Sequence, residues 1–250
     1  MRQVTATAAV QLAPNPGPMT LEGTNTWVLR APDHEACVVV DPGPLHEGHL
    51  QAVAAAGRVV AILLTHGHAD HSEGAARLAE LTGAGVRALD PAHRLGDEGL
   101  GQGDVVTAAG LELRVLATPG HTSDSLSFVL PDAVLTGDTV LGRGTSVVAH
   151  PDGVLTDYLA SLALLRELDD LTVLPGHGPE LPHAGSAAQA YLDHRQARLE
   201  QVRAAVAAGA STPEQVVAVV YADVDRALWP AATLSVLAQL EHLGPPASGC

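Results

Sequence analysis

The sequence contains no lysine: all 13 basic residues are arginine, against 28 acidic residues, for a formal net charge of −15. Aromatic residues are also scarce, with two Trp, three Tyr and one Phe. Proteins that hold a nucleic-acid backbone normally present a basic track and aromatic platforms for the bases. The composition therefore disfavours nucleic acid as the partner, although Arg143, Arg195, Arg198 and Arg203 could form a local basic patch.

Cysteines and long apolar runs are scarce as well. Cys37 and Cys250 are the two cysteines, too few for a disulfide framework. No apolar run approaches the roughly 20 residues that a membrane-spanning helix needs. Residues 1–7 carry one charge and no long apolar core, so we expect no secretory signal, no membrane partner and a cytoplasmic location. The hydrophobic content of 46% is typical of a globular protein.

The most informative segment combines imidazole and carboxylate groups at very short spacing. Four metal-binding side chains lie within six residues: His66, His68, Asp70 and His71. The apolar segment 61–65 before them predicts a strand, and residues 72–79 after them predict a helix. Imidazole and carboxylate ligands suit zinc, manganese and iron(II), and a short turn can direct several of them at one point. A histidine-rich surface loop is the alternative interpretation.

Three further apolar strands each end in a potential ligand that directly follows a glycine. These ligands are His121 after residues 113–120, Asp138 after residues 133–137 and His177 after residues 171–176. Glycine permits a sharp turn out of a strand, and side chains at strand ends are held rigidly. If the four strand ends meet at one edge, they supply seven ligands, which is enough for a binuclear metal site.

The pattern H-x-H-x-D-H with a distant His, Asp and His resembles the signature of the metallo-β-lactamase superfamily, over residues from about 41 to 177. The resemblance implies one metal on His66, His68 and His121, a second on Asp70, His71 and His177, and Asp138 as the bridge. It implies two divalent ions, Zn²⁺ first, with Mn²⁺ or Fe²⁺ as alternatives. Zinc β-lactamases usually place Cys at the position of Asp138, and diiron flavoproteins place Glu at that of His68, so neither activity is expected.

Other segments are similar to the branch of the superfamily named after β-lactamase-like protein 2. They cover residues 15–27, 142–147, 191–195, 220–223 and 228–232. That branch includes a single-stranded-RNA endoribonuclease and thioesterases that act on carrier-bound polyketides. The resemblance therefore leaves the substrate open.

Strands and helices alternate over residues 1–183, which predicts a layered α/β fold. The resemblance sharpens this to a four-layer αββα sandwich with the metals at one edge of the paired sheets. Strands are predicted at 27–29, 36–40, 59–64, 86–88, 111–116, 126–130, 134–136 and 172–174, and helices at 47–56, 70–82 and 154–168.

From about residue 184 the pattern is helical only. It predicts helices over 187–208, from Thr212-Pro213, and from Trp229-Pro230 to about residue 243, with Pro tolerated at a first helical position. We therefore expect a metallo-β-lactamase-type domain over residues 1–183 and a small helical module over residues 184–250 packed on it.

Several residues outside the ligand set are candidates for supporting roles. Asp41 ends another strand, where it could hydrogen-bond a ligand histidine or begin a turn. Thr24 and Asn25 could line the pocket or cap a loop. His194 and Arg195 lie on a predicted helix, which favours a solvated or interface pair and leaves contact with a substrate anion open.

These observations predict a binuclear metal-dependent hydrolase of a small ester or thioester. A metal-bridging hydroxide would attack the substrate, and Asp70 and Asp138 would serve catalysis. A single-stranded-RNA endoribonuclease is the first alternative. The second is a mononuclear iron sulfur dioxygenase that uses only His66, His121 and Asp138 as a two-His-one-carboxylate face.

Overall fold

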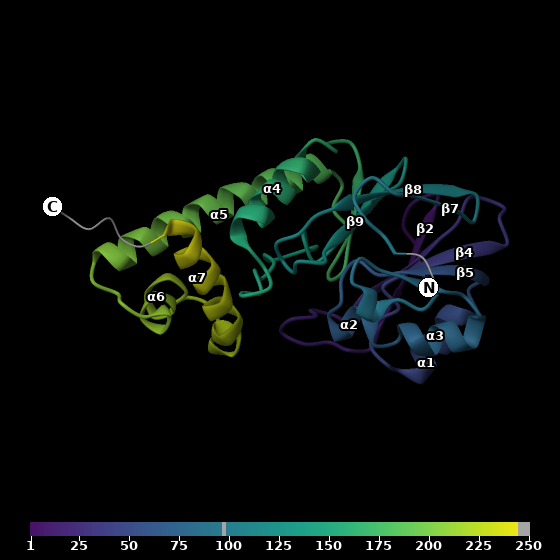
Figure 1. Ribbon diagram of the computed structural model, residues 1–250, viewed down its shortest axis with the longest axis horizontal. Helices are drawn as coiled ribbons and strands as arrows, with labels where there is room; N and C mark the ends of the chain where they lie inside the picture. Colours follow the sequence, from purple (N-terminus) through teal and green to yellow (C-terminus); the bar gives the residue numbers. More distant parts are fainter. Residues whose placement is uncertain (97–98, 245–250) are drawn as a thin grey trace.

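The computed structural model describes residues 1–96 and 99–244, which form two packed sheets flanked by helices (Figure 1). In spatial order, the first sheet consists of β1 (Arg2–Gln3), β2 (Ala8–Leu12), β3 (Asn25–Leu29), β4 (Ala36–Val40), β5 (Arg58–Leu63) and β6 (Val86–Arg87). The second consists of β11 (Thr172–Pro175), β10 (Ala133–Gly137), β9 (Leu126–Val129), β8 (Leu111–Ala117) and β7 (Val105–Ala108). The pairs β4–β5, β5–β6 and β10–β11 are parallel, so the carboxyl ends within each pair lie at the same edge.

The helices are α1 (Glu47–Ala54), α2 (Ala69–Ser72), α3 (Ala75–Thr82), α4 (Leu155–Arg166), α5 (Ala184–Ala207), α6 (Pro213–Val220) and α7 (Trp229–Leu243), with 3₁₀ turns η1 (Pro91–His93) and η2 (Arg226–Leu228). An apolar core that contains Trp27, Leu113 and Phe128 fills the space between the sheets. A second core joins α1 and α3 to the outer face of the first sheet, and a third joins α4 and α5 to the other sheet. The predicted αββα sandwich is confirmed.

The C-terminal helices are anchored through α5, which runs beside α4 and extends beyond the sheets (Figure 1). Ala188 and Tyr191 in its first half belong to the core of the second sheet. Val202 in its second half packs instead with Val217 of α6 and Val236 of α7. Within the part of the chain that the structure describes, no helix has both the length and the apolar content needed to cross a membrane.

The predicted helix over 70–82 is divided into α2 and α3 at Gly74. The Gly74 amide donates to the Gly43 carbonyl at 2.9 Å and not to a carbonyl of the preceding turn. A Cβ at Gly74 would lie 2.8 Å from Leu50 Cδ2, so only glycine lets the α1 layer approach so closely. The prediction also missed β1 and β2, since a two-residue strand and an alanine-rich strand carry little β-propensity, and it missed β7 although Val and Thr favour strands.

The turn that follows β8 depends on Gly120, which precedes His121. Gly120 has φ +133°, a conformation that is essentially restricted to glycine. A Cβ at this position would also collide with the backbone of Tyr158 in α4. The close contact between this turn and α4 therefore fixes where His121 leaves the sheet.

We predict that Gly120→Ala lowers the free energy of unfolding by about 3 kcal/mol or more, because it adds a steric clash to backbone strain. The matched control is Gly83→Ala at the end of α3, where φ is +75° but no atom lies within 4 Å of an added Cβ. There we expect a loss of about 1–2 kcal/mol from the left-handed conformation alone. Urea unfolding of both variants measures the difference, and equal losses would contradict the clash.

Candidate metal centre

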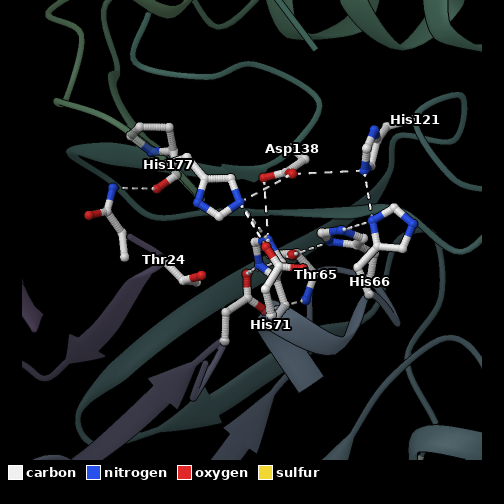
Figure 2. Close-up of polar contacts among 12 residues, drawn as sticks. Thr24, Thr65, His66, His71, His121, Asp138 and His177 are labelled. Carbon is white, nitrogen blue, oxygen red and sulfur yellow. Dashed lines mark hydrogen bonds and ion pairs between the residues drawn. The ribbon is translucent and has the colours of Figure 1, made fainter. Parts of the chain in front are cut away.

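All seven side chains predicted as ligands lie together where β5, β8, β10 and β11 end (Figure 2). They form three overlapping groups in which the candidate ligand atoms of each group lie within 4.8 Å of one another. The groups are His66–His68–His121, His66–His71–Asp138 and Asp70–His71–His177. The sequence therefore identified every member of this cluster.

The first group has the spacing of ligands around a single ion. His68 Nδ1 lies 3.1 Å from His66 Nε2 and 3.0 Å from His121 Nε2. Nitrogen ligands of a tetrahedral zinc ion lie about 3.3 Å apart when each is 2.0–2.1 Å from the metal. The three imidazoles can thus hold a divalent ion with only small shifts of their rings.

Asp70, His71 and His177, called the second group from here on, are arranged similarly, and Asp138 lies beside both this group and the first. His177 Nε2 lies 3.2 Å from His71 Nε2 and 3.1 Å from Asp70 Oδ2. Asp138 Oδ2 lies 3.5 Å from His177 Nε2 and 3.8 Å from His121 Nε2, and Figure 2 shows the carboxylate between these two imidazoles. Asp138 Oδ1 is buried and accepts no hydrogen bond from the described residues. An orphaned carboxylate oxygen in this position fits a role as metal ligand.

One buried carboxylate orients histidines in both groups. Asp41 Oδ2 accepts hydrogen bonds from His71 Nδ1–H at 2.9 Å and from the Thr65 hydroxyl at 2.7 Å. Because the Thr65 hydroxyl donates to Asp41, its oxygen is free to accept from His66 Nδ1–H, which is 3.0 Å away. When these two histidines are neutral, Nδ1 therefore carries the proton and Nε2 is free to bind a metal ion.

Backbone carbonyls orient the other two imidazoles that present Nε2. His121 Nδ1–H donates to the Val147 carbonyl at 2.7 Å, and His177 Nδ1–H donates to that of Gly23 at 3.2 Å. The turn that carries His177 is braced by Asn25, whose side-chain amide donates to the carbonyls of Pro175 at 3.0 Å and Gly178 at 2.8 Å. Asn25 therefore stabilises the turn that positions His177.

Glycines make room for the ligands in two different ways. Gly137 has φ +49°, and a Cβ there would lie 2.5 Å from Thr65 Oγ1. Gly176 has no such backbone conformation, but a Cβ there would collide with Asp138 Oδ1 and lie 2.7 Å from His71 Cε1. At Gly176 the reason for glycine is therefore the close approach of the ligands, and not the conformational freedom expected from the sequence.

The pKa shifts of the histidines differ in direction between the first and the second group. Burial lowers the pKa of His66 well below its usual value and also lowers the pKa of His121. Burial opposes a charged His177, but Asp138 and Asp70 outweigh it and raise the pKa of His177 to about 9. The carboxylates of Asp138 and Asp41 likewise raise the pKa of His71 well above its usual value, against the effect of burial. Before a metal binds, His66 and His121 are thus largely neutral, whereas His71 and His177 hold protons.

The supporting residues proposed from sequence have distinct positions. Asp41 contacts a ligand histidine as expected, whereas the hydroxyl of Thr24 accepts from Asn15 Nδ2 at 3.0 Å. Sequence reasoning missed Thr65, although it directly precedes the motif and carries a hydroxyl. It also missed the Val147 carbonyl, for which no residue type provides a signal.

A cavity of about 290 Å³ opens beside the cluster and is lined by His121 and Asp138. Its other walls come from the loops 18–21 and 141–147, from α5 and α7, and from residues 221–228 between α6 and α7. Three arginines of the predicted basic patch line this cavity: Arg143, Arg195 and Arg198. The fourth, Arg203, instead pairs with Glu200 at 2.7 Å.

Several known proteins are similar to this chain over most of its length. A thioesterase named atrochrysone carboxyl ACP thioesterase, from Aspergillus fumigatus, is 34% identical over 203 residues, which cover 76% of this chain and 62% of that protein. A β-lactamase-like protein 2 homolog from Drosophila melanogaster is 30% identical over 92% of this chain and 86% of its own length. The similarity to the β-lactamase-like protein 2 branch is thereby confirmed. This chain spans less than two thirds of the thioesterase's length.

The fold has close structural neighbours, and two family models match the chain. A metallo-β-lactamase family protein from Thermus thermophilus superimposes with a TM-score of 0.79 at 23% identity, covering 94% of this chain and 92% of that one. The model of a β-lactamase-associated winged helix domain matches residues 212–244, which here contain α6 and α7. The model of the metallo-β-lactamase superfamily matches residues 19–177, the segment that contains every ligand of the cluster. The chain belongs to the metallo-β-lactamase superfamily.

Proposed function

We propose that this protein is a binuclear metal-dependent hydrolase that cleaves a small ester or thioester. The observation that carries the proposal is the convergence of seven ligands beside a cavity of about 290 Å³. In this assignment His66, His68 and His121 hold one ion and Asp70, His71 and His177 hold the other, with Asp138 between them. Zinc is the expected metal because nitrogen and oxygen donors at tetrahedral spacing suit it, while Mn²⁺ or Fe²⁺ remain alternatives.

Bound divalent ions would lower the pKa of a shared water toward neutrality, so that it attacks as hydroxide, and would polarise the oxygen of the scissile bond. The protein holds the ligands in place through Asp41 and the backbone carbonyls. Asp138 keeps the two groups at a fixed separation, and Asp70 lies at the edge of the second group, where it can orient the attacking water. Hydrolysis of a thioester adds water across the C–S bond and yields a carboxylate and a thiol.

The preference for a small acyl substrate rests on the cavity and the charge. The cavity is small, at the lower end of the size range of ligand pockets, and the net charge of −15 repels a long polyanion. The relative that is named as a thioesterase supports the same preference.

A single-stranded-RNA endoribonuclease is the competing function that the tests can reveal. The second group of ligands favours two ions over the single iron of a sulfur dioxygenase. The cytoplasmic location stays a prediction.

We predict that Asp138→Asn lowers hydrolysis of an acyl thioester at least about 100-fold, since even the loss of an outer partner of a ligand costs 10–100-fold. The amide cannot provide two anionic oxygens to two ions, so we expect metal content to fall as well. Elemental analysis and kcat/KM of zinc-loaded protein measure both effects. Asp157→Asn, on the exposed side of α4, is the control. Near wild-type rates in Asp138→Asn would contradict the binuclear assignment.

We predict that Asp41→Asn weakens zinc binding about 10- to 100-fold, because the acceptor that orients His71, and His66 through Thr65, is impaired. A competition titration against a chromophoric chelator measures the affinity. Unfolding of the metal-free variant must be followed in parallel, because Asp41 is buried. Loss of stability with unchanged zinc affinity would show that Asp41 supports only the fold.

We predict that the two zinc equivalents differ in proton release. His177, with a pKa near 9, and His71 are protonated at pH 7 in the metal-free protein and must lose their protons to coordinate. Affinity at the second group should therefore rise as the pH increases from 7 toward 9, whereas affinity at the first group should change little, because the pKa values of His66 and His121 are lowered. Calorimetric titration in two buffers of different ionisation enthalpy measures the protons released. Equal release by both equivalents would contradict this.

A further inference from the structure

The cavity beside the metal centre has a wall that the proposed chemistry does not use. His194, Arg195 and Arg198 follow one another on α5, and all three line the cavity that also exposes His121 and Asp138. Residues of α7 and of the segment between α6 and α7 also line the cavity. These three residues, which we call the α5 wall, therefore border the same cavity as the metal centre.

Arg195 is a buried cation that lacks an anionic partner. It is only 2% exposed, yet no carboxylate of the described residues forms an ion pair with it. One Nη donates to the Ser146 carbonyl, and the guanidinium lies 4.9 Å from the centroid of the Tyr158 ring, while Nε has no hydrogen-bond partner among the described residues. Burial of an uncompensated charge is costly, so this position favours a ligand that brings a negative charge.

Arg198 and His194 extend the same arrangement. Arg198 donates to the Val220 carbonyl at 2.6 Å and to Gln201 Oε1 at 2.9 Å, and its guanidinium lies 4.6 Å from the Tyr221 ring centroid. No described carboxylate pairs with it either. Burial, then the charges of the two arginines, lowers the pKa of His194 to about 4, so the ring is neutral at pH 7. Its Nδ1 is buried and has no partner in the described residues.

Several exposed arginines of this chain pair with carboxylates. Arg77 pairs with Glu47 at 2.9 Å, Arg2 with Glu180 at 2.8 Å and Arg203 with Glu200 at 2.7 Å. The chain has 28 acidic residues against 13 arginines, and yet no carboxylate of the described residues forms an ion pair with Arg195 or Arg198. These two arginines of the cavity therefore differ from the paired arginines of the surface.

We infer that the α5 wall is a subsite for a single negatively charged group of the substrate, a carboxylate or a phosphate. This rests on the proposed function and narrows it to thioesters that carry an anion within reach of the scissile bond. The aliphatic side chains of Leu141, Val224 and Leu228 line the same cavity and suit the carbon chain beside the anion. The anion can belong to the acyl side, as a carboxylate, or to the thiol side, as the phosphate of a carrier arm.

Two matched pairs of thioesters separate these sources. S-glutaryl- and S-butanoyl-N-acetylcysteamine differ in an acyl carboxylate, and S-butanoyl-4′-phosphopantetheine and S-butanoylpantetheine differ in a phosphate. We expect zinc-loaded wild-type protein to prefer the charged member of one pair at least 10-fold in kcat/KM, mainly through KM. Charge-assisted hydrogen bonds have about this effect. The pair that shows the preference identifies the source of the anion.

The variants test whether the α5 wall causes that preference. Arg198→Gln should lower the ratio of charged to neutral kcat/KM by about 10- to 100-fold, and Arg198→Lys should restore part of it. Ala231→Glu, which places a carboxylate in the cavity wall without removing an arginine contact, should lower the ratio too. Arg203→Gln on the same helix should leave the ratio unchanged. Equal ratios in wild type and all variants would overturn the subsite while leaving the hydrolase intact.

Direct binding keeps the subsite testable if no thioester is hydrolysed, a result that would refute the proposed function. Calorimetry with glutarate and with 4′-phosphopantetheine then compares wild type with Arg198→Gln and Arg203→Gln. Weaker binding only in Arg198→Gln supports the anion subsite, and identical binding in all three overturns it. If Arg198→Gln changes the binding of an unstructured RNA but of neither small anion, the α5 wall serves a nucleic acid, and the inference is wrong.

Discussion

The buried carboxylate of Asp41 connects the ends of two parallel strands to both halves of the metal centre. It follows β4 directly and adopts φ +51°, an uncommon conformation for a residue with a side chain. In that position it accepts from the Thr65 backbone and hydroxyl beyond β5 and from His71, and Thr65 in turn orients His66. The uncommon backbone conformation of Asp41 therefore places its carboxylate where it determines the tautomer of His71 directly and that of His66 through Thr65.

The C-terminal helices take part in the centre although they contribute no ligand. The Val147 carbonyl that orients His121 lies in a loop held from two sides. Arg195 of α5 donates to the Ser146 carbonyl, and the Val148 amide donates to Ser235 Oγ of α7 at 3.3 Å. The same helices line the cavity. A change in their packing would therefore alter both the orientation of a ligand and the space available to a substrate.

The distribution of charge explains how an acidic protein can still select an anion. Over the whole surface the excess of carboxylates repels long polyanions, and this repulsion weakens with distance in salt. Inside the cavity, two arginines without carboxylate partners lie beside a centre that itself would carry divalent ions. A single carboxylate or phosphate on a small substrate is attracted by this local field, whereas an RNA chain would have to place many phosphates near acidic surface.

The sequence by itself identified the seven side chains that cluster in the structure, and it predicted the layered fold. Apolar segments and the imidazole or carboxylate side chains that follow them are local patterns, and parallel strands bring their carboxyl ends to one edge for geometric reasons. Tertiary structure alone decided the break at Gly74, the roles of Asn25 and of the Val147 carbonyl, and the cavity wall on α5. Each of these depends on contacts between segments far apart in the chain. The type of a residue does not show which distant backbone group it will contact. Only the packed structure therefore distinguishes a solvated arginine on a helix from a buried arginine that lines the cavity, as Arg195 does.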